Sequence, residues 1–381
     1  MLRTSSETHG IESLDTIAAA EWDSLVQPGD LFCSYAWLRH LDEATTPHRV
    51  VTMRVDGRLT GAMPMWDGEQ EPGLFWLPDF FAGLAGPWEE PFVWLGARRA
   101  VRNGLICVDG PQRSTTLRRL LAESVEYAKV SGRAGAIMPY LPVAAATELA
   151  RAAPDAVCLL HSAEATVGVP PQGMDDILAN ANGHNRKRRR RELREFTGTG
   201  HTLEWTDITT EVADSIAPLI ANTRRKYGTT DDAEWMRRVF AAQRRVGLLD
   251  VAQAVLCRRN GRLIAAAVCY RHADSLHGRY FGAAEDAIRD GYPYFVTTCY
   301  APIDYAARNG LRQVFLSTSS LEAKLRRGAT AEPLAAVVIP VHGAPKTADV
   351  RSHNQRVALD YRSRFAAYSS SMSPRWLDFL S

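Results

Sequence analysis

The densest group of chemically active side chains in this 381-residue chain is a run of cations. Six basic residues stand side by side in Arg186-Lys-Arg-Arg-Arg-Arg191. Clustered Arg and Lys without base-reading motifs suit the phosphates of an RNA backbone or of a nucleotide. We therefore predict an RNA- or phosphate-binding face made by Arg186, Lys187, Arg189, Arg190 and Arg194. The alternative is a solvated connecting helix whose cations pair with the acidic first half of the chain.

A second set of polar residues lies further along the chain. Lys324 and Arg327 are three residues apart and precede Gly328. On one helical face or around a tight turn they would offer two cationic donors to a phosphate or carboxylate. Arg279 stands between apolar residues of an expected strand, where a buried cation must pair with a carboxylate or with the substrate. Three aromatic residues either line the same pocket or pack in the core: Tyr280, Tyr294 and Tyr300.

The cysteines give no pattern of a metal site or of a disulfide framework. The chain has six of them and no C-x-x-C pair: Cys33, Cys107, Cys158, Cys257, Cys269 and Cys299. Scattered cysteines of this kind suit a reducing compartment. We therefore expect a cytoplasmic protein without a bound metal. Cys299 is disfavoured as a nucleophile because the sequence places no His beside it.

The net charge of +2 conceals an asymmetry between the two halves. Residues 1–170 contain 14 Lys and Arg against 21 Asp and Glu, whereas residues 171–381 contain 31 against 22. An anionic partner should therefore meet mainly the C-terminal half. No run of about 18 apolar residues occurs, so we expect no membrane span. The N-terminal segment lacks the apolar core of a signal peptide.

These residues must be positioned by elements that occur twice along the chain. Residues 53–66 and 257–270 both place a turn dipeptide, Asp-Gly or Asn-Gly, between apolar stretches, which predicts a tight β-hairpin. Residues 127–138 and 305–316 both read as a helix end, a Gly in the left-handed cap position and a buried strand. The same order of elements in both halves predicts a duplicated α/β module.

Two further segments mark the boundaries of these modules. The Pro-Pro-Gln-Gly stretch at 170–173 breaks regular structure, and a helix with acids in its first turn is expected from Met174. Residues 67–96 are rich in aromatics, Gly and Pro and read as an insertion. We expect the insertion to pack on its own domain. A pocket wall or a dimer contact is the alternative.

Several short motifs of the chain resemble a known family. In the N-terminal half these are Phe32-Cys-Ser-Tyr-Ala-Trp-Leu38 and the Val-Asp-Gly-Arg-Leu-Thr-Gly-Ala segment that ends at Ala62, and the basic run also fits. The C-terminal motifs are Gly278-Arg-Tyr-Phe-Gly282, Tyr294-Phe295, Cys299-Tyr300, Ile303, Tyr305-Ala306, Gly310 and Lys324-Leu-Arg-Arg-Gly328. Together they resemble the FemAB-like proteins of peptidoglycan biosynthesis and recognition, within the GNAT acyltransferase superfamily.

The resemblance implies an α/β (α+β) fold of two tandem GNAT-like domains, each a mixed, mostly antiparallel sheet flanked by helices. We assign them to residues 1–168 and 201–381, joined by a linker and the basic helix at 169–200, with the active site in the second. The resemblance also implies transfer of an acyl or aminoacyl group to an amine, with aminoacyl-tRNA as donor in the Fem branch. Relatives carry a His before the Lys of the Lys-x-x-Arg-Gly motif, where this chain has Ala323.

The donor and the catalytic groups are less closely fixed by the sequence. Residues 281–294 lack the glycine spacing of a CoA pyrophosphate loop, which together with the basic run favours aminoacyl-tRNA over acyl-CoA. Backbone N–H groups of a bulged strand near Tyr280–Gly282 could stabilise an oxyanion. Glu285 and Asp304 are the preferred general bases. A small molecule or peptide amine is the expected acceptor. Acyl-CoA as donor, or a binding protein without turnover, remains the alternative.

Overall fold

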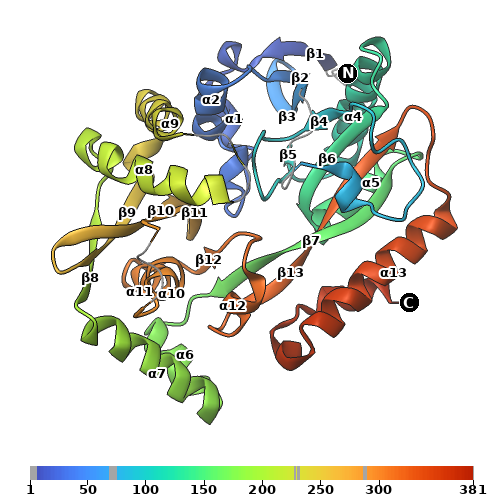
Figure 1. Cartoon of the computed structure of the whole chain (residues 1–381). Coiled ribbons are helices and arrows are strands. Elements are labelled where there is room, and N and C mark those ends of the chain that lie inside the picture. The colour runs from blue at the N-terminus through green and yellow to red at the C-terminus, as the bar shows by residue number, and fades with distance from the viewer. Residues whose placement is uncertain (1–6, 68–74, 227–228, 230–231, 286–289, 381) are drawn as a thin grey trace. The chain divides into compact units, whose positions relative to one another are not determined.

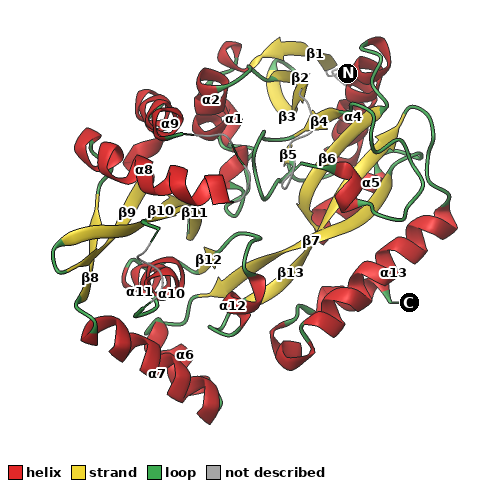
Figure 2. Cartoon of the chain, viewed as in Figure 1, coloured by secondary structure: helices red, strands yellow, loops and turns green. Residues whose placement is uncertain are grey.

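The computed structural model describes residues 7–67, 75–226, 229, 232–285 and 290–380 (Figure 1). Helices and strands both occur throughout this length, as Figure 2 shows. The predicted mixed α/β class is confirmed.

The chain contacts divide the protein into two compact units. Unit 1 consists of Met1–Ala163, Glu332–Ala366 and Ser373–Ser381. Unit 2 consists of Glu164–Ala331 and Ala367–Met372. The predicted domains differ from these units at residues 164–168, which belong to unit 2, and at residues 332–366 and 373–381, which belong to unit 1. The pairing of a late strand, described below, is the reason for the second of these differences.

Unit 1 is a mixed sheet with strand order β1-β2-β3-β4-β6-β13-β7, to which β5 adds at β3. Helix α4 packs on β2, β3 and β6, and α1 packs on β3. The strands of unit 1, of which the last two also extend into unit 2, are β1 (Glu7–Ser13), β2 (Arg49–Val55), β3 (Arg58–Asp67), β4 (Val93–Leu95), β5 (Ile106–Cys107), β6 (Gly135–Pro142), β7 (Val157–Gly168) and β13 (Thr330–Pro340). Its helices are α1 (Ala19–Asp23), α2 (Tyr35–Ala44), α3 (Leu77–Phe80), α4 (Arg113–Val130), α5 (Val143–Arg151) and α13 (Thr347–Arg364).

Unit 2 repeats this plan with strand order β7-β12-β11-β10-β9-β8. Its own strands are β8 (His201–Thr206), β9 (Ala252–Arg259), β10 (Arg262–His272), β11 (Ser275–Ala283) and β12 (Gln313–Phe315). Its helices are α6 (Met174–Asn180), α7 (Gly183–Gly198), α8 (Thr210–Lys226), α9 (Ala233–Arg245), α10 (Pro293–Phe295), α11 (Ala301–Arg308) and α12 (Leu321–Leu325). Helices α8 and α9 lie on one side of β9–β11, and α10 and α11 lie on the other (Figure 1).

The two predicted hairpins are confirmed, and their turns explain why the sequence specifies them. Strands β2 and β3 meet at Asp56-Gly57, with φ angles of 49° and 79°. Strands β9 and β10 meet at Asn260-Gly261, with φ angles of 50° and 82°. Both residues of each turn are in the left-handed region, which Asp, Asn and Gly tolerate best and which matches the twist of a two-residue hairpin. The helix–Gly–strand repeats are confirmed as α4-Gly132-β6 and α11-Gly310-β12.

Each sheet is completed by a strand from the other half of the sequence. In unit 2, β12 pairs antiparallel with the end of β7, with Phe315 opposite Thr166. In unit 1, β6 pairs antiparallel with β13, with Leu334 opposite Pro142. Because β13 completes the sheet of unit 1, most of the residues that follow it, including α13, belong to unit 1.

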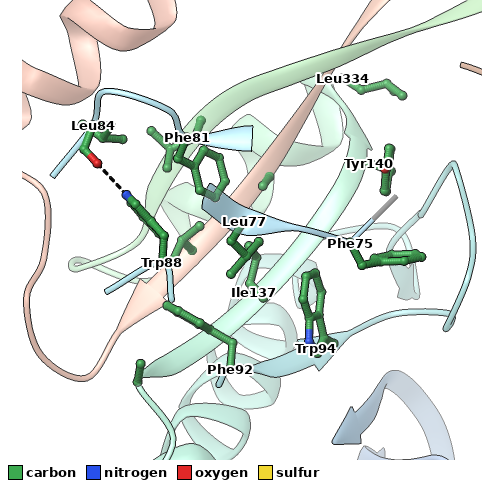
Figure 3. Close-up of a cluster of buried hydrophobic side chains, with 14 of the residues drawn as sticks. Phe75, Leu77, Phe81, Leu84, Trp88, Phe92, Trp94, Ile137, Tyr140 and Leu334 are labelled. Atoms are coloured by element: carbon green, nitrogen blue, oxygen red, sulfur yellow. Dashed lines mark hydrogen bonds between the residues drawn. The ribbon is translucent and has the colours of Figure 1, made fainter. Parts of the chain in front are cut away.

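The aromatic insertion of unit 1 forms a buried cluster, as expected (Figure 3). Its large side chains are almost fully shielded from solvent: Phe75, Phe81, Trp88, Phe92 and Trp94. The Trp66 and Trp94 rings stack with centroids 5.3 Å apart, and Trp88 donates its indole N–H to the carbonyl of Leu84 at 2.7 Å. The described part of the insertion therefore belongs to the core of its own unit.

Candidate functional site

The basic run lies on α7, and the helix divides it between surface and interior. Helix α7 begins after Asn182, whose side chain accepts the N–H of Asn185 at 2.9 Å. Four cations of the helix are exposed: Lys187, Arg190, Arg191 and Arg194. Arg186 is half-buried and donates to the carbonyl of Ala181 at 2.9 Å. The predicted phosphate-binding face is thus available at Lys187, Arg190 and Arg194.

Arg189, which we predicted to bind RNA, lies in the interior of unit 2. Its side chain donates to the carbonyl of Arg326 at 2.9 and 3.1 Å and to that of Ile177 at 3.3 Å. The residue is 5% exposed, and burial lowers the pKa of its guanidinium. Three of its N–H groups are committed to main-chain carbonyls, so Arg189 fixes the helix to the segment after α12 and does not face a ligand.

A buried ion pair also connects α7 to the Lys-x-x-Arg motif. Arg327 donates to both carboxylate oxygens of Glu192, at 2.7 and 3.1 Å, and Tyr300 donates its hydroxyl to the same carboxylate at 2.6 Å. The side chains of Arg327 and Glu192 are 6% and 3% exposed. The Arg327 guanidinium also lies over the ring of Phe295, 3.2 Å from its centroid. Glu192 is the residue that sequence reasoning missed, because its partners lie more than 100 positions away.

Lys324 is buried beside the end of β12. Its ammonium group donates to the carbonyl of Leu316 and, at 3.5 Å, to that of Ser317. Burial lowers the pKa of Lys324 to about 8, an effect that nearby Cys299 and Glu164 partly oppose. Burial raises the pKa of the Cys299 thiol, and the group is therefore a poor nucleophile at neutral pH.

The strands around Lys324 separate and leave a cavity. Strands β11 and β12 are parallel and pair only from Ser275 to His277, opposite Gln313 to Phe315. The next residues of β11 contain a bulge against β10, in which Val268 faces Tyr280 and Cys269 faces Gly278, so Arg279 is the extra residue. A cavity of about 170 Å³ lies here, lined in part by Arg279, Tyr280 and Lys324. The expected bulge therefore exists, one residue before the predicted stretch.

A larger cavity of about 880 Å³ adjoins these elements within unit 2. It is lined by α7, α8, β9, β11, α10 and α12, through residues that include Glu195, Lys226, Arg259, Phe281, Tyr294 and Ala323. Tyr294 and Phe281 line both this cavity and the smaller one. At Ala323, where the resemblance suggests a His, a methyl group meets the cavity, so no imidazole enters it from that position.

The two predicted general bases lie in different surroundings. Asp304 on α11 is half-buried and accepts the backbone N–H of Met174 at 2.7 Å, at the start of α6. Burial raises the pKa of this carboxyl, although the Met174 N–H opposes the effect. Glu285 is exposed just beyond β11. Neither residue lines the two cavities described above, and their catalytic roles stay predictions.

The described residues offer no group of three or more His, Cys, Asp and Glu side chains that could share a metal ion. None of the described helices combines the length and the apolar character needed to cross a membrane. The six cysteines are present as free thiols.

The two units have the same strand order, and in unit 2 the parallel strands β11 and β12 separate beyond a short pairing. The chain belongs to the FemAB-like family of peptidoglycan biosynthesis/recognition proteins, whose model matches residues 109–366. Membership of this family connects the chain with peptidoglycan biosynthesis or recognition. No protein with a curated function matches the sequence.

Several solved structures are similar to this chain, and two of them have TM-scores above 0.5. FemX is similar with a TM-score of 0.59 at 12% identity, over 88% of this chain and 97% of that chain. A conserved protein of unknown function from Bacteroides thetaiotaomicron has a TM-score of 0.53 at 15% identity, over 85% of this chain and 98% of that chain. A tandem GNAT protein from the clavulanic acid biosynthesis pathway has a TM-score of 0.49 at 12% identity, over 88% of this chain and 99% of that chain.

Proposed function

We propose that unit 2 transfers an aminoacyl group from aminoacyl-tRNA to the amine of a small molecule or peptide. The observation that carries the proposal is the position of α7. The helix presents the exposed cations Lys187, Arg190 and Arg194, and its residue Glu195 lines the 880 Å³ cavity together with Thr199, which directly follows the helix. A phosphate-binding surface beside a cavity of this size suits a donor that is a polyanion with an acyl group at its end.

The reaction needs positioning more than covalent chemistry. The neutral amine attacks the ester carbonyl, a C–N bond forms, and the bond from carbon to the ribose oxygen breaks as the amine proton passes to that oxygen. We assign the oxyanion to N–H groups of the bulged β11 near Tyr280. Glu285 is our preferred proton acceptor, and Arg279, Tyr294 and Lys324 are assigned to the substrates. Because Asp304 already accepts a backbone N–H, it ranks below Glu285.

The test uses a mixed pool of labelled aminoacyl-tRNAs together with a pool of amine acceptors. We expect label to leave the tRNA as amide product, and tRNA affinity to fall steeply with salt. The variant Lys187→Glu/Arg190→Glu should lose both binding and transfer. Arg238→Glu/Arg245→Glu on α9 has the same change in charge and is the matched control. Full transfer by the α7 variant would contradict the proposal.

Acyl-CoA is the second donor that we consider, because the 880 Å³ cavity also has room for a pantetheine arm. The sequence lacks the glycine spacing of a pyrophosphate loop at residues 281–294, and residues 286–289 of this segment lie outside the described residues. A thermal shift with CoA but none with tRNA would favour this donor. No product from either donor, with tight binding of a wall peptide, would favour a binding protein.

A further inference from the structure

A third cavity in unit 2 brings together arginines from two separate segments. It has a volume of about 330 Å³. Arg188 and Arg191 reach it from α7, and Arg326 and Arg327 reach it from the end of α12. Two aromatic residues, Tyr292 and Phe295, complete the part of the lining used below. We call this space the arginine cavity.

The charge of the arginine cavity is positive. Its lining contains four arginines and two acids, Glu192 and Glu322, which leaves a formal charge of +2. Glu192 is already bound by Arg327 and Tyr300, and Glu322 pairs with Arg326. The two acids of the lining are therefore held by the α12 segment, and Arg191 of α7 pairs instead with Glu195, which does not line the cavity.

The two α7 arginines keep N–H groups for a ligand. Arg188 contacts the His184 ring nitrogen at 2.8 Å through one nitrogen. Arg191 contacts Glu195 at 3.4 Å and the Tyr292 hydroxyl at 3.4 Å, and its side chain is 58% exposed. A guanidinium carries five N–H donors, so each side chain retains several after these contacts. Planar guanidinium groups with free donors bind phosphate in a bidentate manner.

The aromatic side of the arginine cavity is shared with the larger cavity. Tyr292 and Phe295 line both spaces, and so does Ala323. The two rings have centroids 6.4 Å apart at an interplanar angle of 32°. An aromatic ring beside cations is the combination that supports a nucleobase next to its phosphate. A nucleotide held here would have its far end directed toward the 880 Å³ cavity.

We propose that the arginine cavity is a nucleotide site, in which Arg188 and Arg191 bind the phosphate and Tyr292 supports the base. The inference rests on the proposed function only where it identifies this nucleotide with the acyl donor. The same chemistry is present in the 3′-terminal nucleotide of an RNA and in the adenosine phosphate of CoA. The probes below distinguish these two sources.

The experiment measures binding by calorimetry to the full-length protein with four probes: AMP, inorganic phosphate, CoA and a short single-stranded RNA that ends in a 3′-adenosine. The variant Arg188→Ala/Arg191→Ala removes the proposed phosphate ligands. Its matched control, Arg238→Ala/Arg245→Ala, removes two exposed cations of α9 that do not line the cavity. Tyr292→Asn removes the ring at a position with φ of 58°, which Asn tolerates.

We expect the cavity variant to bind AMP at least tenfold more weakly, while the control binds it as the wild type does. Tyr292→Asn should weaken AMP but leave the affinity for inorganic phosphate unchanged. Equal AMP binding by the cavity variant and its control, or none by the wild type, would overturn the inference. Preference for the RNA or for CoA identifies the source. If the cavity variant loses AMP binding and the wild type transfers nothing from aminoacyl-tRNA, the result supports this site and contradicts the proposed function.

Discussion

The buried pair of Glu192 and Arg327 makes a sharp prediction about stability. Replacing Glu192 with Met leaves the Arg327 guanidinium, 6% exposed, without its carboxylate. Breaking a buried ion pair by removing one partner costs about 3–5 kcal/mol, because a desolvated charge remains. The Tyr300 hydroxyl loses its acceptor in the same variant. We therefore expect Glu192→Met to lower the free energy of unfolding of unit 2 by about 3–5 kcal/mol.

A double-mutant cycle isolates the interaction. Glu192→Met/Arg327→Leu removes both charges, and apolar replacements of a buried pair are often nearly neutral. The double variant should therefore be more stable than Glu192→Met, with a coupling energy of at least about 2 kcal/mol. The exposed pair of Arg237 and Asp214, 3.1 Å apart with side chains 39% and 54% exposed, is the control. Asp214→Ala should cost no more than about 1 kcal/mol.

Hydrogen exchange of peptides from α7, combined with urea denaturation, is the appropriate assay because the chain has two compact units and one transition cannot be assumed. Protection of α7 should fall in Glu192→Met and recover in the double variant. Additive effects of the two single changes, or a cost no larger than that of Asp214→Ala, would refute the reasoning. Either result would mean that the carboxylate does not anchor α7.

Three further changes test other parts of the structure. The pKa of Lys324 is about 8 in the folded protein and about 10.4 when unfolded, so the folded state binds fewer protons between these values. The cost to stability of burying the protonated Lys324 side chain is therefore complete below pH 8, and stability rises as this cost fades up to about pH 10.4. In a pH series of urea titrations, Lys324→Met should remove this rise. Gly282→Ala would put a methyl group into the backbone of Leu219 and Ile220, and we expect a loss of about 1–3 kcal/mol by thermal unfolding. Trp94→Ala in the aromatic cluster should cost about 3–5 kcal/mol, and AMP titration should show unchanged binding in unit 2.

The two units have the same order of strands, but the space beside their parallel strands is filled by side chains in unit 1 and forms a cavity in unit 2. In unit 1, β4 is parallel to β6, with Trp94 opposite Ile137. Aromatic residues of the insertion occupy the neighbouring core, in contact with Tyr140. In unit 2 the corresponding pair, β11 and β12, borders the 170 Å³ cavity. The aromatic core stabilises unit 1, whereas the cavity in unit 2 leaves space for a ligand. This difference supports a site in unit 2.

The sequence alone determines those features of the protein that depend on interactions between neighbouring residues. The Asp56-Gly57 and Asn260-Gly261 turns specify their hairpins because positive φ angles favour these residues over others. The helix of the basic run also follows from neighbouring residues. The repeat of these signals was enough to predict two similar α/β halves.

Tertiary structure alone decided which residues meet across long separations. Nothing local distinguishes buried Arg189 from exposed Arg190, because each lies within the same run of cations and the partners of Arg189 come from distant carbonyls. Glu192 is one acid among many until Arg327 and Tyr300 fold against it. The pairing of strands from different halves of the sequence likewise depends on tertiary structure. Every residue type offers similar backbone donors and acceptors, so the packing of the whole sheet determines which strands pair.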